Sequence, residues 1–116
     1  MKESIVQNKS FQFSLKVISL YRELQGEKEF VISRQLLRSG TSIGANIEEA
    51  SAGQSKRDFI AKMSISSKEA RETKYWLRLL KKSNLTEINV DLLLKEIEEL
   101  IKMLTAIVKT SQQSLN

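Results

Sequence analysis

Residues 34–50 read RQLLRSGTSIGANIEEA, and this stretch decides the fold because it follows a helical period while carrying Gly40 and Gly44. Inside a helix each glycine costs about 0.8–1 kcal/mol relative to alanine, so a compensating contact is expected. A helix surface without Cβ atoms allows a neighbouring backbone to approach closely. Small and apolar residues share one face at i, i+4, i+7, i+11 and i+14: Leu36, Gly40, Ile43, Ile47 and Ala50. We therefore predict a helix over residues 31–50 that packs tightly against the helix following it.

The preceding segment, residues 9–25, has the same period but is apolar on two sides. Phe13, Val17, Leu20 and Leu24 lie on one side and Phe11, Leu15 and Ile18 on the other. An arc this wide exceeds what a surface helix of a monomer needs. It indicates that the helix buries one face in its own domain and a second in a partner. Gly26 is expected to end this helix in a left-handed conformation, and residues 1–8 are left without assigned structure.

A short polar turn, SAGQS at 51–55, separates the glycine-bearing helix from the next one. Ser55 is expected to cap that helix by accepting from a first-turn amide, with Asp58 favourable near its positive end. The helix continues to Lys82. A turn this short predicts an antiparallel hairpin in which positions equidistant from the turn face one another.

That equidistance places Glu48 and Glu49 beside Arg57 and Lys56. A solvated ion-pair cluster is the favoured interpretation, and such a cluster contributes little to stability. A carboxylate pair doing acid/base chemistry is the remote alternative, because the facing positive charges favour ionisation of both groups.

A polar linker over residues 83–89 leads to a fourth helical segment, residues 90–113, with Asn89 as its expected N-cap. Leu92, Met103 and Ala106 lie outside its core face and are either scattered surface residues or part of a subunit contact. Four amphipathic helices with short connections predict an all-α fold. We expect a single-domain antiparallel four-helix bundle, up-down-up-down, over residues 1–116.

The composition excludes several kinds of chemistry. The 116 residues contain no cysteine, histidine or proline. Disulfides, thiolate nucleophiles, zinc sites built on Cys or His and the usual general base near neutral pH are therefore absent. We expect no enzyme activity, no cofactor and no metal. The lack of cysteine, of a signal-peptide pattern and of an apolar run near the roughly 20 residues that cross a bilayer predicts a cytoplasmic protein.

Positive charge is concentrated in residues 55–82. The chain carries a formal charge of +5, yet this segment alone has nine basic and three acidic residues, an excess of six. The helical period aligns four of these basic residues, at i, i+3, i+7 and i+10, and Lys82 lies beside the last of them. Together they form a ridge of Arg71, Lys74, Arg78, Lys81 and Lys82. Such a ridge suits nucleic-acid phosphates, although long basic side chains also solvate the outer face of any amphipathic helix. Tyr75 and Trp76 interrupt the ridge, where they either stack on bases or serve packing, and packing is the more common use.

The run RSGTSIGANIEEA at 38–50, followed by SKRDFIAKMSISSKEARETKYWLRLL at 55–80, resembles the four-helix bundle family called 23S rRNA intervening-sequence proteins. Genes of that family lie inside insertions of bacterial ribosomal RNA genes. A related branch serves as accessory proteins to reverse transcriptases of diversity-generating retroelements, and members resembling it form five-membered rings with basic surfaces. The resemblance implies a homo-oligomer, a pentamer by that analogy, with RNA, DNA or a nucleic-acid enzyme as partner.

Three functional hypotheses follow. The favoured one is a non-enzymatic oligomeric bundle, a nucleic-acid-binding or accessory scaffold protein, that acts through the basic ridge. The alternative is a structural or protein-interaction ring with no nucleic-acid role, whose charge serves solubility. An enzyme is the remote third, because without histidine or cysteine it would need buried carboxylates or a lysine, and no predicted helix has an inward-facing cluster of them.

Overall fold

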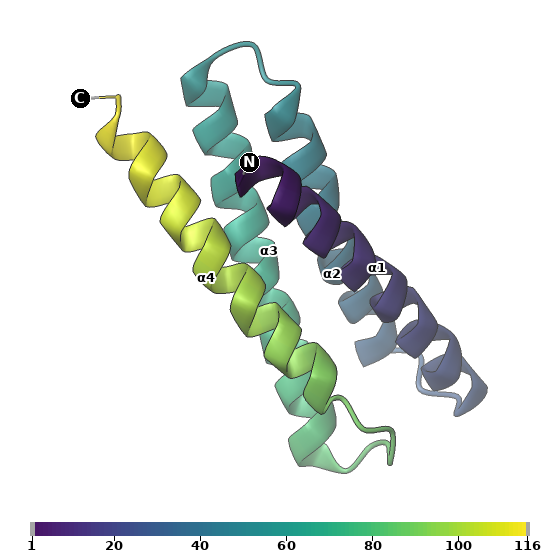
Figure 1. Ribbon diagram of the computed structural model, residues 1–116. Coiled ribbons are helices and arrows are strands. Elements are labelled where there is room, and N and C mark those ends of the chain that lie inside the picture. The colour runs from purple at the N-terminus through teal and green to yellow at the C-terminus, as the bar shows by residue number, and fades with distance from the viewer. Residues whose placement is uncertain (1, 116) are drawn as a thin grey trace.

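The computed structural model describes residues 2–115, with side chains over 5–115. It contains four helices: α1 (Lys2–Gly26), α2 (Ile32–Ser51), α3 (Lys56–Ser83) and α4 (Asp91–Gln113). Consecutive helices run in opposite directions, and the beginning of α1 and the end of α4 lie at the same end of the molecule (Figure 1). Around the bundle α1 packs on α2, α2 on α3, α3 on α4, and α4 on α1. The fold is an all-α antiparallel four-helix bundle, as the sequence predicted. It measures 49 × 21 × 21 Å.

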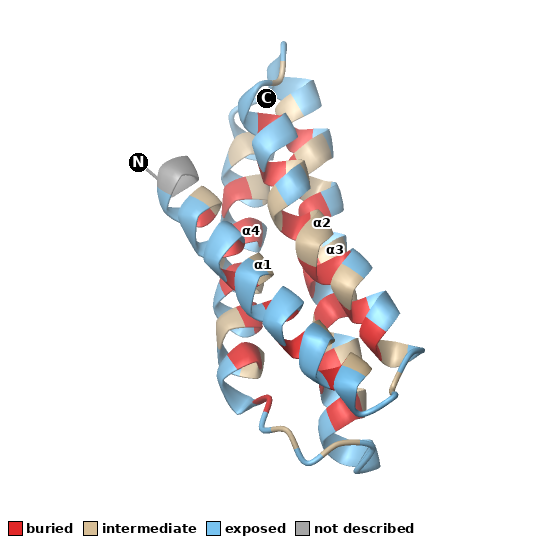
Figure 2. Cartoon of the chain, turned by 90° about the vertical axis from the view of Figure 1, so that its right-hand side faces the viewer, coloured by how far each residue is buried: buried red, intermediate tan, exposed pale blue. Residues whose placement is uncertain are grey.

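The core follows the inward face of each helix, where buried residues recur about once per turn (Figure 2). The largest fully buried side chains include Phe13, Leu36, Met63, Leu77 and Leu104. α1 extends farther toward the N-terminus than the segment assigned from sequence, and Val6 is fully buried. Met1 lies outside the described residues. Within residues 2–115, no helix is both long and apolar enough to cross a membrane.

The glycines of α2 face α1, so the prediction that they face α3 is wrong. A Cβ added at Gly40 would lie 2.9 Å from both γ-carbons of Val17, and one added at Gly44 would lie 3.3 Å from the Ser10 hydroxyl oxygen. Val17 and Ser10 both belong to α1. The period identified the close-packing face correctly, but it did not identify which neighbouring helix uses it.

Buried hydroxyl groups link α2 to α3 by hydrogen bonds. The buried Ser66 hydroxyl donates to the Ile43 carbonyl oxygen at 2.8 Å, and the hydroxyl oxygens of Thr73 and Ser39 are 2.9 Å apart in a hydrogen bond. In both pairs the α3 residue lies several positions farther along the chain than predicted. The prediction had assumed that residues at equal distances from the turn face one another. These bonds satisfy polar groups that would otherwise be costly to bury.

The end of α1 differs from the expectation. Gly26 is helical with a negative φ, and the left-handed residue is Lys28, at φ 64°. Lys28 N–H donates to the Gln25 carbonyl and Glu29 N–H to the Leu24 carbonyl, at 3.0 and 2.9 Å, which is the Schellman pattern. The left-handed residue that terminates α1 therefore lies two positions after Gly26.

The carboxylate of Glu29 caps the start of α2, a role the sequence reading missed. It accepts from the backbone N–H groups of Val31, Ile32 and Ser33 at 3.1, 3.1 and 2.7 Å. Partial burial acts to raise the pKa of Glu29, but the three backbone donors outweigh it, and the net pKa is lowered from its ordinary value of 4.5. The carboxylate is thus held in its ionised form.

The other predicted caps are present. The Ser55 hydroxyl accepts from Asp58 N–H at 3.0 Å at the start of α3. The Asn89 side chain accepts from Asp91 N–H at 2.8 Å, one position ahead of the backbone N-cap, Val90. These bonds explain why the predicted starts of α3 and α4 agree with the structure to within one residue.

Candidate nucleic-acid interface

The outward side of α3 carries an uninterrupted line of exposed residues. At i, i+3, i+7, i+10 and i+14 this line, called here the outer face of α3, consists of Lys68, Arg71, Tyr75, Arg78 and Lys82. Four are basic, one is aromatic, and every one is exposed. Ser66, Ala70, Thr73, Leu77 and Leu80 line the opposite, buried side of the helix. The outer face therefore presents four positive charges along about 21 Å of helix, at about 1.5 Å per residue.

This line differs in part from the predicted ridge. Arg71, Arg78 and Lys82 belong to it, whereas Lys74 and Lys81 turn toward α4. Lys74 Nζ lies 3.3 Å from Glu98 Oε1, and Lys81 Nζ lies 2.7 Å from Asp91 Oδ1. The charges of these two lysines are thus partly neutralised by carboxylates of α4.

Lys68 belongs to the outer face but was left out of the ridge. The signal was in the sequence, because Lys68 precedes Arg71 by three residues and so continues the same helical series. Arg71 also reaches α4, with its Nη2 3.4 Å from the Thr105 hydroxyl oxygen, a neutral contact that leaves its charge uncompensated.

The acidic residues of the middle of α3 point away from the outer face. Glu69 and Glu72 both pair with Arg38 of α2; the Glu69 contact is 3.2 Å long. Because α3 turns Glu69 and Glu72 toward α2 while the four cations of the outer face point outward, opposite charges are segregated across this part of the helix. Segregation of this kind strengthens the positive field on the exposed side.

A groove of about 460 Å³ lies between the outer face and α4. Four basic and two acidic side chains and one leucine line it: Lys74, Arg78, Lys81, Lys82, Asp91, Leu94 and Glu98. The excess of cations makes this groove a continuation of the positive surface rather than a separate polar site.

Tyr75 lies at the centre of the outer face, and its ring contacts that of the neighbouring Trp76. The ring centroids of Tyr75 and Trp76 are 5.2 Å apart with the planes at 70°, an edge-to-face arrangement. Trp76 packs partly against the core, and its Nε1–H donates to Glu72 Oε2 at 2.9 Å. Trp76 therefore serves packing, as the more common use predicts, whereas Tyr75 is 54% exposed.

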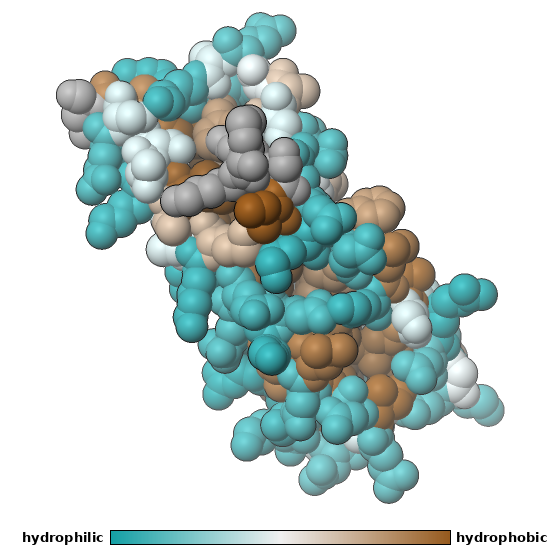
Figure 3. All heavy atoms as spheres, in the orientation of Figure 1, coloured by the Kyte–Doolittle hydropathy of each residue, from teal (hydrophilic) through white to brown (hydrophobic). Residues whose placement is uncertain are grey.

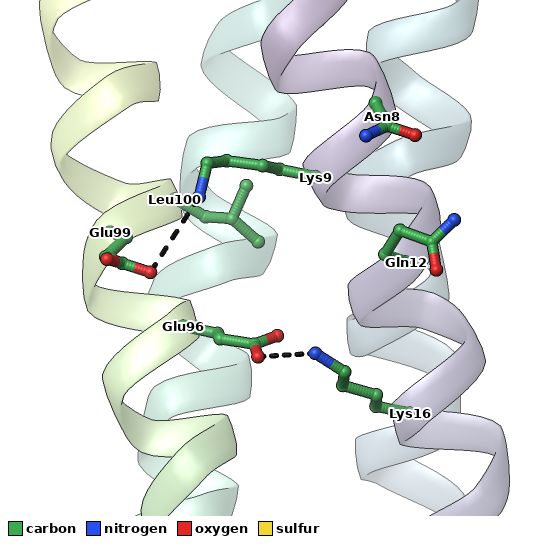
Figure 4. A pocket seen from close by; sticks show the side chains of 7 residues that line it. All are labelled: Asn8, Lys9, Gln12, Lys16, Glu96, Glu99 and Leu100. Atoms are coloured by element: carbon green, nitrogen blue, oxygen red, sulfur yellow. Dashed lines mark hydrogen bonds and ion pairs between the residues drawn. The ribbon is translucent and has the colours of Figure 1, made fainter.

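A second groove, between α1 and α4, is polar but internally compensated. Figure 4 shows Lys9 reaching Glu99 and Lys16 reaching Glu96 across it, with Leu100 beneath. Its volume is about 200 Å³. Two lysines facing two glutamates leave no net charge to attract a ligand.

The ion pair predicted for Glu49 forms with a different partner. Glu49 pairs with Lys62 at 2.8 Å and not with the predicted Lys56 or Arg57, and its hydrogen bond raises the pKa of Lys62. Lys56 instead contacts the Ser114 hydroxyl near the end of α4. Among the residues that the structure describes, no cluster of three or more acidic side chains is arranged to hold a metal ion.

These features define a small all-α bundle protein in which the exposed side of one helix, α3, is strongly basic. The chain belongs to the 23S rRNA-intervening sequence protein family, whose model matches residues 2–106. A similar solved structure is a crystal structure of a protein of unknown function from the S23 ribosomal protein family of Bacteroides thetaiotaomicron. The two chains are 46% identical, with a TM-score of 0.88, and the match covers 94% of this chain and 99% of the other. No curated protein matches the chain.

Proposed function

We propose that this protein is a non-enzymatic, homo-oligomeric bundle that binds the nucleic-acid backbone through the outer face of α3. The observation that carries this proposal is the segregation of charge across α3, with four exposed cations on one side and Glu69 and Glu72 paired with Arg38 on the other. Cations that neutralise phosphates release condensed counterions, which supplies affinity without reading sequence. RNA and DNA are both expected ligands, and a nucleic-acid enzyme bound to the same RNA or DNA is the expected protein partner.

The oligomer is supported by the apolar line on the outside of α1. Phe11, Leu15 and Ile18 are 60, 48 and 39% exposed, and they lie on the side of α1 opposite its buried residues. Apolar surface follows the α1 side of the molecule in Figure 3. Closed symmetric homo-oligomers are the usual way for one chain to cover such a patch. Five is the copy number implied by the family resemblance alone.

Repetition matters for binding because one outer face offers only four charges. A ring would present several copies to one nucleic-acid strand, so that each further contact forms at high effective concentration. Weak contacts by single subunits would then combine into useful affinity.

A structural ring without a nucleic-acid role is the second candidate. It is favoured by the ion pairs of Lys74 and Lys81 with α4, because two of the five predicted ridge cations are then paired with carboxylates of the same subunit on its surface. In that case the remaining charge serves solubility.

Charge reversal on the outer face distinguishes the two candidates. Arg78→Glu, and more strongly the double variant Arg71→Glu with Arg78→Glu, should weaken binding to all nucleic-acid sequences alike and flatten its salt dependence, with helicity and oligomeric mass unchanged. Arg34→Glu is the matched control, because Arg34 is an exposed arginine of α2 that lies off the outer face. Equal effects of Arg78→Glu and Arg34→Glu would contradict the proposal. Loss of oligomeric mass in the double variant would place these arginines in a subunit interface and favour the structural ring.

A further inference from the structure

Tyr75 is the one residue of the outer face of α3 that counterion release does not explain. It lies four residues after Arg71 and three before Arg78, so basic side chains flank it on both sides along the helix. More than half of its surface is exposed. Its large apolar ring therefore contributes little to the core, although it occupies the middle of a charged line.

The ring of Tyr75 rests on a fixed support. Trp76 contacts it edge-to-face at 5.2 Å, and Trp76 is itself held by the hydrogen bond from its Nε1–H to Glu72 and by packing against the core. Glu72 is held in turn by Arg38 of α2. Because this chain of contacts restricts the Tyr75 ring before any ligand arrives, a flat ligand group would lose less side-chain entropy on stacking there.

We propose that Tyr75 stacks on an unpaired base while Arg71, Arg78 and Lys82 hold the adjacent phosphates, so that the outer face selects single-stranded over double-stranded nucleic acid. The inference rests on the proposed function and adds the class of nucleic acid to it. Every base has a π-face, so an aromatic side chain within a basic track binds single strands with little sequence preference. In a duplex the base faces are already stacked on one another, and only the phosphates remain for the outer face.

The test compares four proteins on three probes. Wild type, Tyr75→Ala, Tyr75→Phe and the control Phe30→Ala are each titrated with a single-stranded RNA, a single-stranded DNA of the same sequence and the corresponding DNA duplex at fixed low salt. Phe30 is an exposed aromatic residue of the α1–α2 turn, 45% accessible, and so reports the effect of removing any surface ring. Far-UV circular dichroism verifies that each variant keeps its helices.

We expect wild type to bind both single strands more tightly than the duplex. Tyr75→Ala should weaken single-strand binding by about fivefold or more, the usual effect of removing one stacked aromatic ring, while duplex binding and the salt slope stay unchanged. Tyr75→Phe and Phe30→Ala should behave like wild type. RNA and DNA single strands should respond alike, because stacking does not involve the 2′-hydroxyl.

Trp76 supplies an independent readout, since it is the only tryptophan in the chain and lies beside Tyr75. Single strands should change its fluorescence in wild type, and this change should shrink in Tyr75→Ala. Equal affinity of wild type for duplex and single strands, or equal loss on all probes in Tyr75→Ala, would overturn the stacking inference and leave backbone binding intact. Loss of oligomeric mass in Tyr75→Ala would assign the ring to a subunit contact and overturn it as well. Absence of binding to every probe would overturn the proposed function and this inference together.

Discussion

Replacing Gly40 by alanine should destabilise the bundle, even though alanine is the better helix former. The added methyl group would lie 2.9 Å from Cγ1 and Cγ2 of Val17 and 3.3 Å from its Cβ. Val17 is fully buried and β-branched, so it has few rotamers through which to withdraw. The collision must therefore be relieved by moving α1 away from α2.

The magnitude follows from two opposing terms. Overpacking of a core costs about 1–3 kcal/mol, and the gain in helix propensity returns about 0.8–1 kcal/mol. The net expectation is a loss of about 1 kcal/mol, or about 4 °C in Tm for a chain of 116 residues. Gly26→Ala is the matched control, because Gly26 is helical and a Cβ there meets nothing within 4 Å. It should stabilise by about 0.4–1 kcal/mol.

Urea and thermal unfolding followed by circular dichroism at 222 nm measure both variants, at one protomer concentration because any association shifts the apparent stability. Gly44→Ala should fall between them, since its methyl group would lie 3.3 Å from the Ser10 hydroxyl oxygen and 3.6 Å from the Cβ and the carbonyl carbon of Ser10, farther than the 2.9 Å at Gly40. In the Val17→Ala background the cost of Gly40→Ala should disappear, and a double-mutant cycle measures that coupling. A Gly40→Ala variant as stabilised as Gly26→Ala would refute the close α1–α2 contact.

Two further predictions concern the Glu29 cap and the α1 surface. Glu29→Gln should cost about 0.3–1 kcal/mol at pH 7, because the amide keeps one oxygen acceptor but loses the negative charge that is favourable at a helix N-terminus. Because the folded-state pKa of Glu29 is lowered, its contribution is present above the unfolded value of about 4.5 and is lost as pH falls through the folded pKa. Unfolding measured from pH 7 down to pH 3 should show the wild-type and Glu29→Gln curves converging, and a constant gap would contradict the charged cap. Leu15→Glu should lower the mass measured by light scattering at micromolar concentration while helicity persists. Gln12→Glu, at an exposed polar position on the α4 side of the same helix, should leave the mass unchanged. A monomeric wild type would contradict the oligomer.

The architecture was predictable because each helix carries its own signals. The period of apolar residues, the Ser55 cap and the Asn89 cap are all local, so they gave the starts and ends of α2, α3 and α4 to within one residue. The start of α1 was assigned too late because residues 2–8 are mostly polar. Val6 is buried by residues distant in sequence, which a local pattern does not reveal.

What failed was the choice of partners between helices. Gly40 and Ser39 are adjacent in sequence, yet Gly40 packs on Val17 of α1 and Ser39 hydrogen-bonds Thr73 of α3. A helical period locates both near the core side but does not say which neighbour each one meets. The basic ridge shows the same limit, because only the placement of α4 reveals that Lys74 and Lys81 meet carboxylates.

The most direct measurement is the salt dependence of binding of wild-type protein to a labelled single-stranded RNA, starting at about 50 mM salt, where electrostatic binding is strong. If the outer face of α3 binds phosphates, the logarithm of the affinity should fall linearly with the logarithm of salt concentration. The slope should be about 0.7 for each phosphate neutralised, or about 2–3 for the four cations of one subunit, and larger for a ring that engages several copies. No binding at 50 mM salt, or an affinity that does not change with salt, would contradict a nucleic-acid role for this surface.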